Sequence, residues 1–375
     1  MSDFAQTQAT VDIARRLVHL TSLKSVYVVP VESIDRSSWA DSTEQGSYFS
    51  ANLGRQAAPF LTRELPNAIS LKSVRRELPN AVRGPFHFIP DNKYPFRIGI
   101  AGGSTVFGLI EALEPLHAAP PQGCRITPLV VGPIPEALYS AAVLADMLQM
   151  RIPGSTIHRI ARLTDAQGGS GINIELNPDC RKAAEEMRTR KEEVALLRRE
   201  EQKLRDMTPM IADFGRSDSG TGERQEQEER VLKLRTTLAN SLKAVGEELM
   251  FDWVITGIGS PNTSQLKAHL RLIYRDNQAL PPKDFVGSIG SRLFNRLLGE
   301  MDAEKADRFV AVSFAWLRYL ANERGRRVIA IAGGVSKLEA LHTLLSCNPA
   351  DRLLNVLITD ELSARVLLRY LDGSY

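Results

Sequence analysis

Cysteine is scarce in this chain, and long apolar runs are absent. The three cysteines among its 375 residues, Cys124, Cys180 and Cys347, lie far apart and form no Cys-x-x-Cys pair. That spacing argues against a disulfide framework and against a structural zinc site. No apolar run approaches the roughly 20 residues that span a bilayer, and the N-terminus lacks a secretory signal pattern. We therefore expect a cytoplasmic protein that makes no membrane contact.

The chain also lacks a strong excess of charge of either sign. The 47 Lys and Arg residues nearly balance the 44 Asp and Glu residues, which leaves a formal net charge of +3. Binding along nucleic-acid phosphates requires a clustered basic face, which this balance does not imply. The six histidines show no metal-ligand spacing, and no Gly-x-Ser-x-Gly motif marks a hydrolase nucleophile. We expect neither a metal nor another cofactor.

The sequence does contain a repeated alternation of apolar strands and helices. The strands are RIGIA (97–101), ITPLVVGP (126–133), DWVITGIGS (252–260), VIAIAGG (328–334) and LLNVLITD (353–360), and a turn and a helix follow each. Strands that are apolar without alternation are buried on both faces, as in a parallel sheet covered by helices. The sequence therefore predicts an α/β fold: a Rossmann-like, mostly parallel sheet with helices on both faces, forming one domain over 1–375.

The N-terminal part of the chain carries weaker signals. A helix is predicted over 10–20 with Thr10 as its cap, followed by a strand over 25–31 and a helix over 53–65. The hexapeptide RELPNA occurs twice, and we interpret it as a duplication within a loop region, at 63–68 and 76–81.

One charged segment interrupts the strand–helix alternation. Residues 180–206 and 223–249 are rich in charge, carry apolar residues near heptad spacing, and are separated by the flexible link GRSDSGTG. This pattern predicts an antiparallel helical hairpin, inserted into the domain over 166–248. Its charge is explained either by a solvated helix surface or by an arm that binds a partner protein or a second copy of the chain.

Two stretches more than 200 residues apart repeat one design: RIGIAGGSTVFGLIEAL (97–113) and RVIAIAGGVSKLEAL (327–341). In each, a strand ends in Gly-Gly and a helix follows. Ligands of parallel sheets bind at the carboxyl ends of strands, and a helix N-terminus there favours an anion. The first turn is therefore a candidate phosphate cradle, formed by Gly102, Gly103, Ser104 and Thr105. The alternative is a tight strand-to-helix turn with no ligand.

The second turn adds a cation. Lys337 follows Gly334 by three residues and falls in the first helical turn, where the helix dipole disfavours positive charge. A bound phosphate or carboxylate would relieve that cost, and the alternative is an ordinary surface lysine. Asp360 ends a further strand, where it could cap the last helix or bind a sugar hydroxyl.

Together these segments resemble the effector domain of SorC-type bacterial regulators, sometimes grouped with DeoR. The matching segments are LGRQAAPFLTREL (53–65), IGIAGGSTVFGLIEAL (98–113), DWVITGIGS (252–260), FVGSIGSRLFNRLLGE (285–300), VIAIAGGVSKLEAL (328–341) and LLNVLITDELSARVLL (353–368). The resemblance covers most of 10–165 and 250–375. It implies a fold like that of glucosamine-6-phosphate deaminase, ribose-5-phosphate isomerase and the CoA transferases, and a phosphorylated sugar as ligand.

The resemblance also implies a role for individual positions. Gly103, Ser104 and Thr105 would hold phosphate, and Lys337 would pair with phosphate or a sugar oxygen. Gly257, Gly259 and Ser260 would line the pocket. The two Gly-Gly turns would then converge on one ligand, and the protein would form a homo-oligomer, as effector domains of this type commonly do.

The sequence departs from the family pattern at two places. Nothing in 1–60 resembles the usual helix-turn-helix, so we expect no direct DNA binding by this chain. Ser288 stands where the family motif has an acid that would orient sugar hydroxyls.

Four hypotheses about function follow. The protein is a phosphosugar sensor that acts by oligomerisation or through a partner protein; an isomerase, deaminase or lactonase of the same fold group; a regulator that contacts DNA through another subunit or an oligomer's basic surface; or a scaffold with a degenerate pocket. An enzyme would need a general base, with Asp360, Glu361 and Lys337 as candidates.

Overall fold

A ten-stranded sheet forms the centre of the molecule. The computed structural model describes residues 7–21, 23–30, 44–74, 95–117, 120, 123–131, 139–165, 172–176, 251–261, 284–323 and 325–373, with scattered positions between 178 and 234. The parallel body of the sheet has the spatial order β1 (Ser25–Val29), β12 (Val356–Asp360), β11 (Arg327–Ile331), β7 (Trp253–Gly259), β2 (Phe96–Ile100), β3 (Cys124–Pro128) and β4 (Ser155–Ile157). The α/β class and the mostly parallel sheet predicted from the sequence are confirmed.

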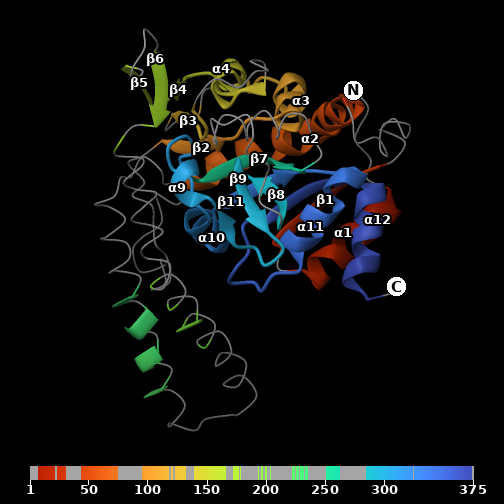
Figure 1. The fold of residues 1–375 in the computed structure, drawn as a ribbon. Coiled ribbons are helices and arrows are strands. Elements are labelled where there is room, and N and C mark those ends of the chain that lie inside the picture. Colours follow the sequence, from red (N-terminus) through yellow and green to blue (C-terminus); the bar gives the residue numbers. More distant parts are fainter. Residues whose placement is uncertain are drawn as a thin grey trace.

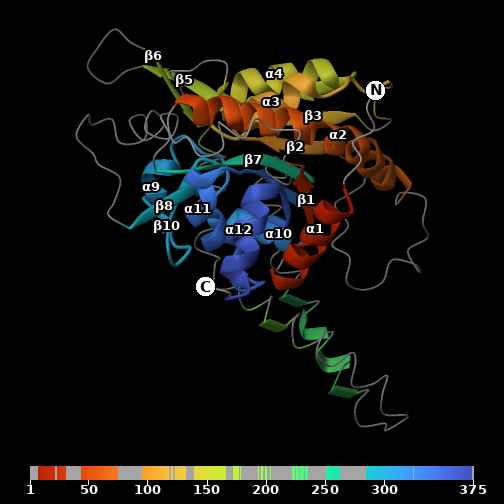
Figure 2. The same cartoon turned by 90° about the vertical axis from the view of Figure 1, so that its right-hand side faces the viewer.

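Helices cover both faces of this sheet (Figures 1 and 2). One face carries α2 (Glu44–Val74), α3 (Ser104–Ala112) and α4 (Ala141–Arg151); the other carries α1 (Gln8–Leu20), α10 (Phe314–Asn322), α11 (Leu338–Leu345) and α12 (Glu361–Leu371). Successive side chains of β11 alternate between the two cores: Val328 packs with the α10–α12 side and Ile329 with the α2–α4 side. The absence of a polar alternation in the strands follows from this double burial.

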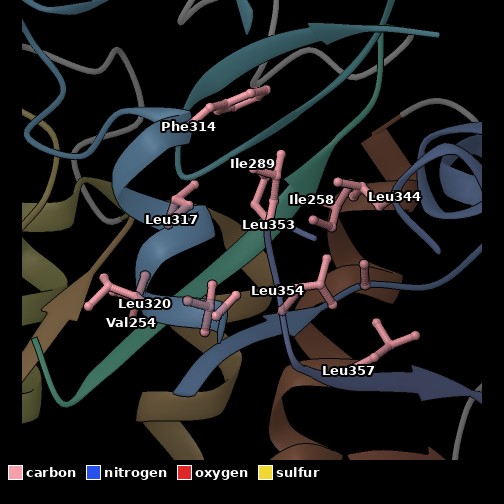
Figure 3. Close-up of a cluster of buried hydrophobic side chains, with 14 of the residues drawn as sticks. Val254, Ile258, Ile289, Phe314, Leu317, Leu320, Leu344, Leu353, Leu354 and Leu357 are labelled. Atoms are coloured by element: carbon pink, nitrogen blue, oxygen red, sulfur yellow. The ribbon is translucent and has the colours of Figure 1, made fainter. Parts of the chain in front are cut away.

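The core on the α10–α12 side is built from leucines of the loop before β12 and from aliphatic residues of the strands. Figure 3 shows part of this cluster, in which Val254 of β7 and Leu317 and Leu320 of α10 lie in the same core as Leu353 and Leu354. All five side chains are at most 1 % exposed. Burial of such side chains stabilises the fold by roughly 1.5–3 kcal/mol each, and it fixes the position of β7 within the sheet.

The end of β7 continues into an antiparallel meander of β8 (Phe285–Ile289), β9 (Arg292–Asn295) and β10 (Glu300–Met301). Gly290 and Ser291 join β8 to β9 with φ angles of 56° and 66°. Two residues with positive φ give the turn geometry that suits a right-handed strand twist. The short helix α9 (Ala303–Ala306) follows the meander.

Two predictions for the N-terminal part are wrong in detail. The cap of α1 is Thr7, whose side chain accepts from the Thr10 amide, so the helix begins earlier than predicted. The first RELPNA copy, 63–68, is not a loop but part of α2, despite Pro66. Leu65 and Ile69 are buried in the core there. This packing offsets the free-energy cost of the backbone hydrogen bond that a proline inside a helix removes. The second copy, 76–81, lies outside the described residues.

The predicted insertion also differs at its start. Strands β5 (Ala161–Asp165) and β6 (Ile172–Leu176) form an antiparallel pair, so 172–176 is a strand and not part of a helical hairpin. Described positions between 193 and 203 and between 222 and 234 are helical. Gln227 donates to the carbonyl and the carboxylate of Glu200 at 2.9 and 3.0 Å, which places the two helical segments side by side. The remainder of 166–248 lies outside the described residues.

None of the helices that the structure describes combines the length and the apolar character needed to cross a bilayer.

Candidate functional site

The two Gly-Gly turns lie on the same edge of the sheet. The first follows β2 and the second follows β11, and both strands pair with β7 in parallel, one on each side. Neighbouring strands are about 4.8 Å apart, so the two turns are separated by roughly 10 Å, with the end of β7 between them. The sequence predicted that the two turns converge, and the strand order brings both turns to this edge, on either side of β7.

A short stretch of helix α2, about one helical turn long, contacts both Gly-Gly turns. Gly54 lies against the first turn, because a Cβ built on it would be 1.9 Å from the Thr105 carbonyl oxygen. Leu53 lies against the second, since its Cδ2 would be 3.0 Å from a Cβ on Gly333. Ser50 reaches the same turn through Lys337, whose Nζ donates to the Ser50 Oγ at 3.1 Å. The segment Ser50–Gly54 is therefore a third wall of the candidate site.

The first turn leaves space beside Gly103. This residue has a φ of 128°, and a Cβ built on it would meet no atom of the described residues within 4 Å. Its amide donates to the Tyr139 carbonyl at 2.9 Å, so that donor is already used. Helix α3 starts at Ser104. Its N-cap residue is Gly103, which has no side chain with which to cap the helix. The helix N-terminus, with its partial positive charge, faces the carboxyl edge of the sheet.

Thr105 and Gly257 face one another across this edge. Thr105 is 3 % exposed, and its Oγ1 would lie 3.9 Å from a Cβ on Gly257. Gly257 is near the end of β7, and a Cβ there would also be 3.9 Å from the Ile331 carbonyl of β11. Residues of β2–α3, β7 and β11 are thus brought together at one point.

The second turn is partly filled by the protein's own side chains. Gly334 has a φ of 88°, and its amide donates to the Asp360 Oδ2 at 3.1 Å and to the Ser363 Oγ at 2.8 Å. That amide is engaged within the protein, and the use of Gly334 in ligand binding stays a prediction. Gly333 must lack a side chain, because a Cβ there would lie 2.0 Å from the Asp360 Oδ2.

Asp360 caps the last helix, as one of the two sequence hypotheses held. Its Oδ1 accepts from the Ser363 amide at 2.8 Å, and its side chain is 2 % exposed. Burial raises the pKa of the Asp360 carboxyl, while hydrogen bonds from Ser363 and Gly334 act in the opposite direction. With both oxygens engaged, Asp360 is held rigidly and carries its negative charge beside the second turn.

Lys337 is buried, so the alternative of an ordinary surface lysine is wrong. It closes the short 3₁₀ turn η6 (Val335–Lys337) that precedes α11, and only 6 % of its surface is exposed. Burial lowers the pKa of the Lys337 amine to about 8, although the charge of Asp360 acts to raise it. Amines with such perturbed pKa values concentrate at functional sites.

The remaining predicted residues surround the end of β7. Gly259 pairs with Ser288 of β8, and Ser288 is 5 % exposed. Ser260 follows β7 and is fully buried. Gly102 precedes Gly103 in the first turn and is half-buried. Their role in lining a ligand pocket stays a prediction.

Sequence reasoning missed Ser50 and the wall it belongs to. Its hydrogen bond to Lys337 joins residues 287 positions apart, which no local pattern reports. Gly54 and Gly108 carried a usable signal, because glycines inside two helices allow close approach of their backbones. A Cβ on Gly108 would lie 1.9 Å from the Ala51 carbonyl oxygen.

Part of the chain is similar to a known protein family. Residues 233–369 match the family model described as "Putative sugar-binding domain". This part of the chain is therefore similar to that sugar-binding domain. The matched range contains β7, Ser288, Lys337 and Asp360, whereas the first Gly-Gly turn and α2 lie outside it. No curated protein matches the sequence of the chain.

Solved structures show the same fold over nearly the whole chain. The full-length sorbitol operon regulator SorC from Klebsiella pneumoniae is 16 % identical with a TM-score of 0.50, and the match covers 98 % of this chain and 83 % of that one. A transcriptional regulator from Streptococcus pneumoniae TIGR4 is 16 % identical with a TM-score of 0.51, covering 97 % and 98 %. At this identity the likeness concerns the fold alone.

Proposed function

We propose that this chain is a sensor that binds a phosphorylated sugar at the carboxyl edge of the sheet. The binding place, called here the sugar site, is formed by Gly103, Thr105, Gly257 and Lys337. The observation that carries the proposal is the meeting of two features on either side of the end of β7: the N-terminus of α3, whose N-cap is the glycine Gly103, and the buried Lys337. Residues 233–369, which include β7 and Lys337, are similar to a putative sugar-binding domain, and this supports a sugar as the ligand.

The phosphate group is assigned to the first turn. No atom of the described residues lies within 4 Å of a Cβ built on Gly103, and the N-terminus of α3 favours an anion there. The second turn is less suited, because the Gly334 amide is engaged and the carboxylate of Asp360 repels phosphate. Lys337 contributes positive charge from the opposite side of β7, and it offsets the charge of Asp360.

A screen of thermal stability tests this proposal. The probes are hexose 6-phosphates, pentose 5-phosphates, the same sugars without phosphate, and inorganic phosphate. A ligand at about 100 times its dissociation constant adds roughly 2.7 kcal/mol to the free energy of unfolding. We expect stabilisation by one or more sugar phosphates and a smaller effect of the matched free sugar. If no phosphorylated sugar stabilises the protein more than its unphosphorylated form, the proposal is wrong.

A second candidate function is catalysis on a phosphosugar, as in an isomerase, deaminase or lactonase. The lowered pKa of Lys337 favours it, because an amine that titrates near 8 can act as a general base. Both oxygens of Asp360 are engaged as a cap, which removes that carboxylate from the list of free bases. Incubation with the sugar phosphates, followed by NMR spectroscopy, distinguishes the two: conversion of any of them supports an enzyme.

The output of the sensor is proposed to pass through a homo-oligomer or a partner protein. One of the two proteins with the same fold is an operon regulator by name and the other is a transcriptional regulator by name, so control of transcription is the process proposed for this chain. Light scattering after size-exclusion chromatography, with and without a stabilising sugar phosphate, reports the oligomeric state. A variant lacking residues 180–249 tests the inserted segment as the contact arm, since its loss would then abolish association.

A further inference from the structure

The ammonium group of Lys337 depends on a contact far away in the sequence. Its Nζ donates to the Ser50 Oγ at 3.1 Å, and the two residues are 6 % and 5 % exposed. Ser50 belongs to α2, on the wall of the sugar site that the sequence did not reveal.

A buried ammonium needs acceptors, because removing its water without replacement costs several kcal/mol. Lys337 has three N–H donors, and Ser50 provides the hydrogen-bond acceptor found for them among the described residues. Asp360 attracts Lys337 electrostatically, but its two oxygens accept from the Ser363 and Gly334 amides. The Asp360 carboxylate therefore attracts the Lys337 amine, and the hydrogen bond to the Ser50 hydroxyl sets the position of the amine.

Helix α2 is held firmly enough to serve as an anchor for this contact. One residue after Ser50, the Ala51 carbonyl packs against Gly108 of α3, and Gly54 packs against the Thr105 carbonyl. Both contacts are between backbones, so the distance between α2 and α3 has little freedom. The Ser50 hydroxyl is consequently held at a defined position relative to the N-terminus of α3.

We infer that Ser50 is a positioning residue of the sugar site, which holds the Lys337 ammonium at the distance from the first turn that binding of a phosphate requires. The part that concerns phosphate rests on the proposed function. The part that concerns the Lys337 amine is independent of any ligand.

The titration of Lys337 without ligand tests the inference directly. In the full chain with ¹³C-labelled lysine, the Lys337 signal is the one that Lys337→Met removes. Ser50→Ala removes the acceptor, so the pKa of Lys337 falls further below its ordinary value, by about one unit. Ser50→Thr keeps the hydroxyl and retains the wild-type titration. Ser346→Ala, an exposed serine at the end of α11, is the matched control and leaves the titration unchanged. An unchanged pKa in Ser50→Ala, or an equal fall in Ser50→Thr, overturns the inference.

Binding of inorganic phosphate, followed by calorimetry across pH 6–9, tests the second part. We expect Ser50→Ala to bind phosphate about tenfold more weakly than wild type and to lose binding at a lower pH, with Ser50→Thr close to wild type. If wild type binds neither phosphate nor sugar phosphates, the proposed function fails while the titration still decides the role of Ser50. If wild type binds phosphate and Ser50→Ala binds it equally at every pH, the positioning role is contradicted.

Discussion

At the scale of single residues, the buried Lys337 makes the free energy of unfolding change with pH in the alkaline range. Between its folded pKa of about 8 and its ordinary value of 10.5, the unfolded chain binds a proton that the folded chain does not. Stability therefore rises with pH in this window, and a shift of this size corresponds to about 3 kcal/mol. We expect the free energy of unfolding of wild type, measured with urea relative to Lys337→Met, to increase from pH 8 to 10.5. A difference that stays constant over this range would contradict the burial of the charged amine.

Arg292 is a second residue whose charge is buried, and it serves the fold. It is fully buried and pairs with Glu300 at 2.6 Å and Asp307 at 2.7 Å. Arg292→Met leaves two nearly buried carboxylates without their cation and should cost about 3–5 kcal/mol in urea unfolding. Arg296→Met is the control, because Arg296 pairs with Glu339 at the exposed surface and such pairs contribute about 0–1 kcal/mol. Equal losses in both variants would contradict this account.

At the scale of elements, the contact between α2 and α3 decides the shape of the sugar site. Gly54→Ala places a Cβ 1.9 Å from the Thr105 carbonyl oxygen and 2.7 Å from the Leu109 amide, so the helices must move apart. We expect a loss of roughly 1–3 kcal/mol, as for other overpacked positions, together with weaker sugar-phosphate binding.

Gly222→Ala is the matched control for this contact. Gly222 is also helical, but a Cβ there meets no atom of the described residues within 4 Å. Because alanine is the better helix former, this change should be neutral or slightly stabilising. Thermal unfolding of both variants separates steric crowding from helix propensity, and a stable Gly54→Ala variant with unaltered binding would refute the close contact.

The elements differ in how far the sequence predicts them. The central parallel strands were predictable, because double burial makes them apolar throughout, as in Ile98 and Ile100 of β2. The edge strand β4 and the antiparallel strands β8, β9 and β10 were not predicted. Helix α2 was only partly predictable, since Pro59 and Pro66 are local signals against a helix that tertiary packing overrides. The strand β6 was missed because residues 166–248 as a whole were predicted to form a helical hairpin.

At the scale of the whole molecule, strand order carried information that no single motif held. Each Gly-Gly turn alone was compatible with simple packing, and the order β11-β7-β2 brings the two turns to one edge. The sequence singled out Thr105, Gly257 and Lys337, and the fold brings them to that edge, while their use in ligand binding stays a prediction. It could not predict that Asp360 engages the Gly334 amide or that Ser50 receives Lys337, because both contacts depend on three-dimensional proximity of remote segments.

The central claim concerns where a phosphate group binds in the whole protein. The most direct measurement is a crystal structure of the chain with the sugar phosphate that stabilises it most in the thermal screen. The account predicts the phosphorus atom at the N-terminus of α3, beside Gly103 and Thr105, with Lys337 facing the ligand across β7. A sugar phosphate bound at any other part of the surface, with the first Gly-Gly turn free of ligand, would contradict it.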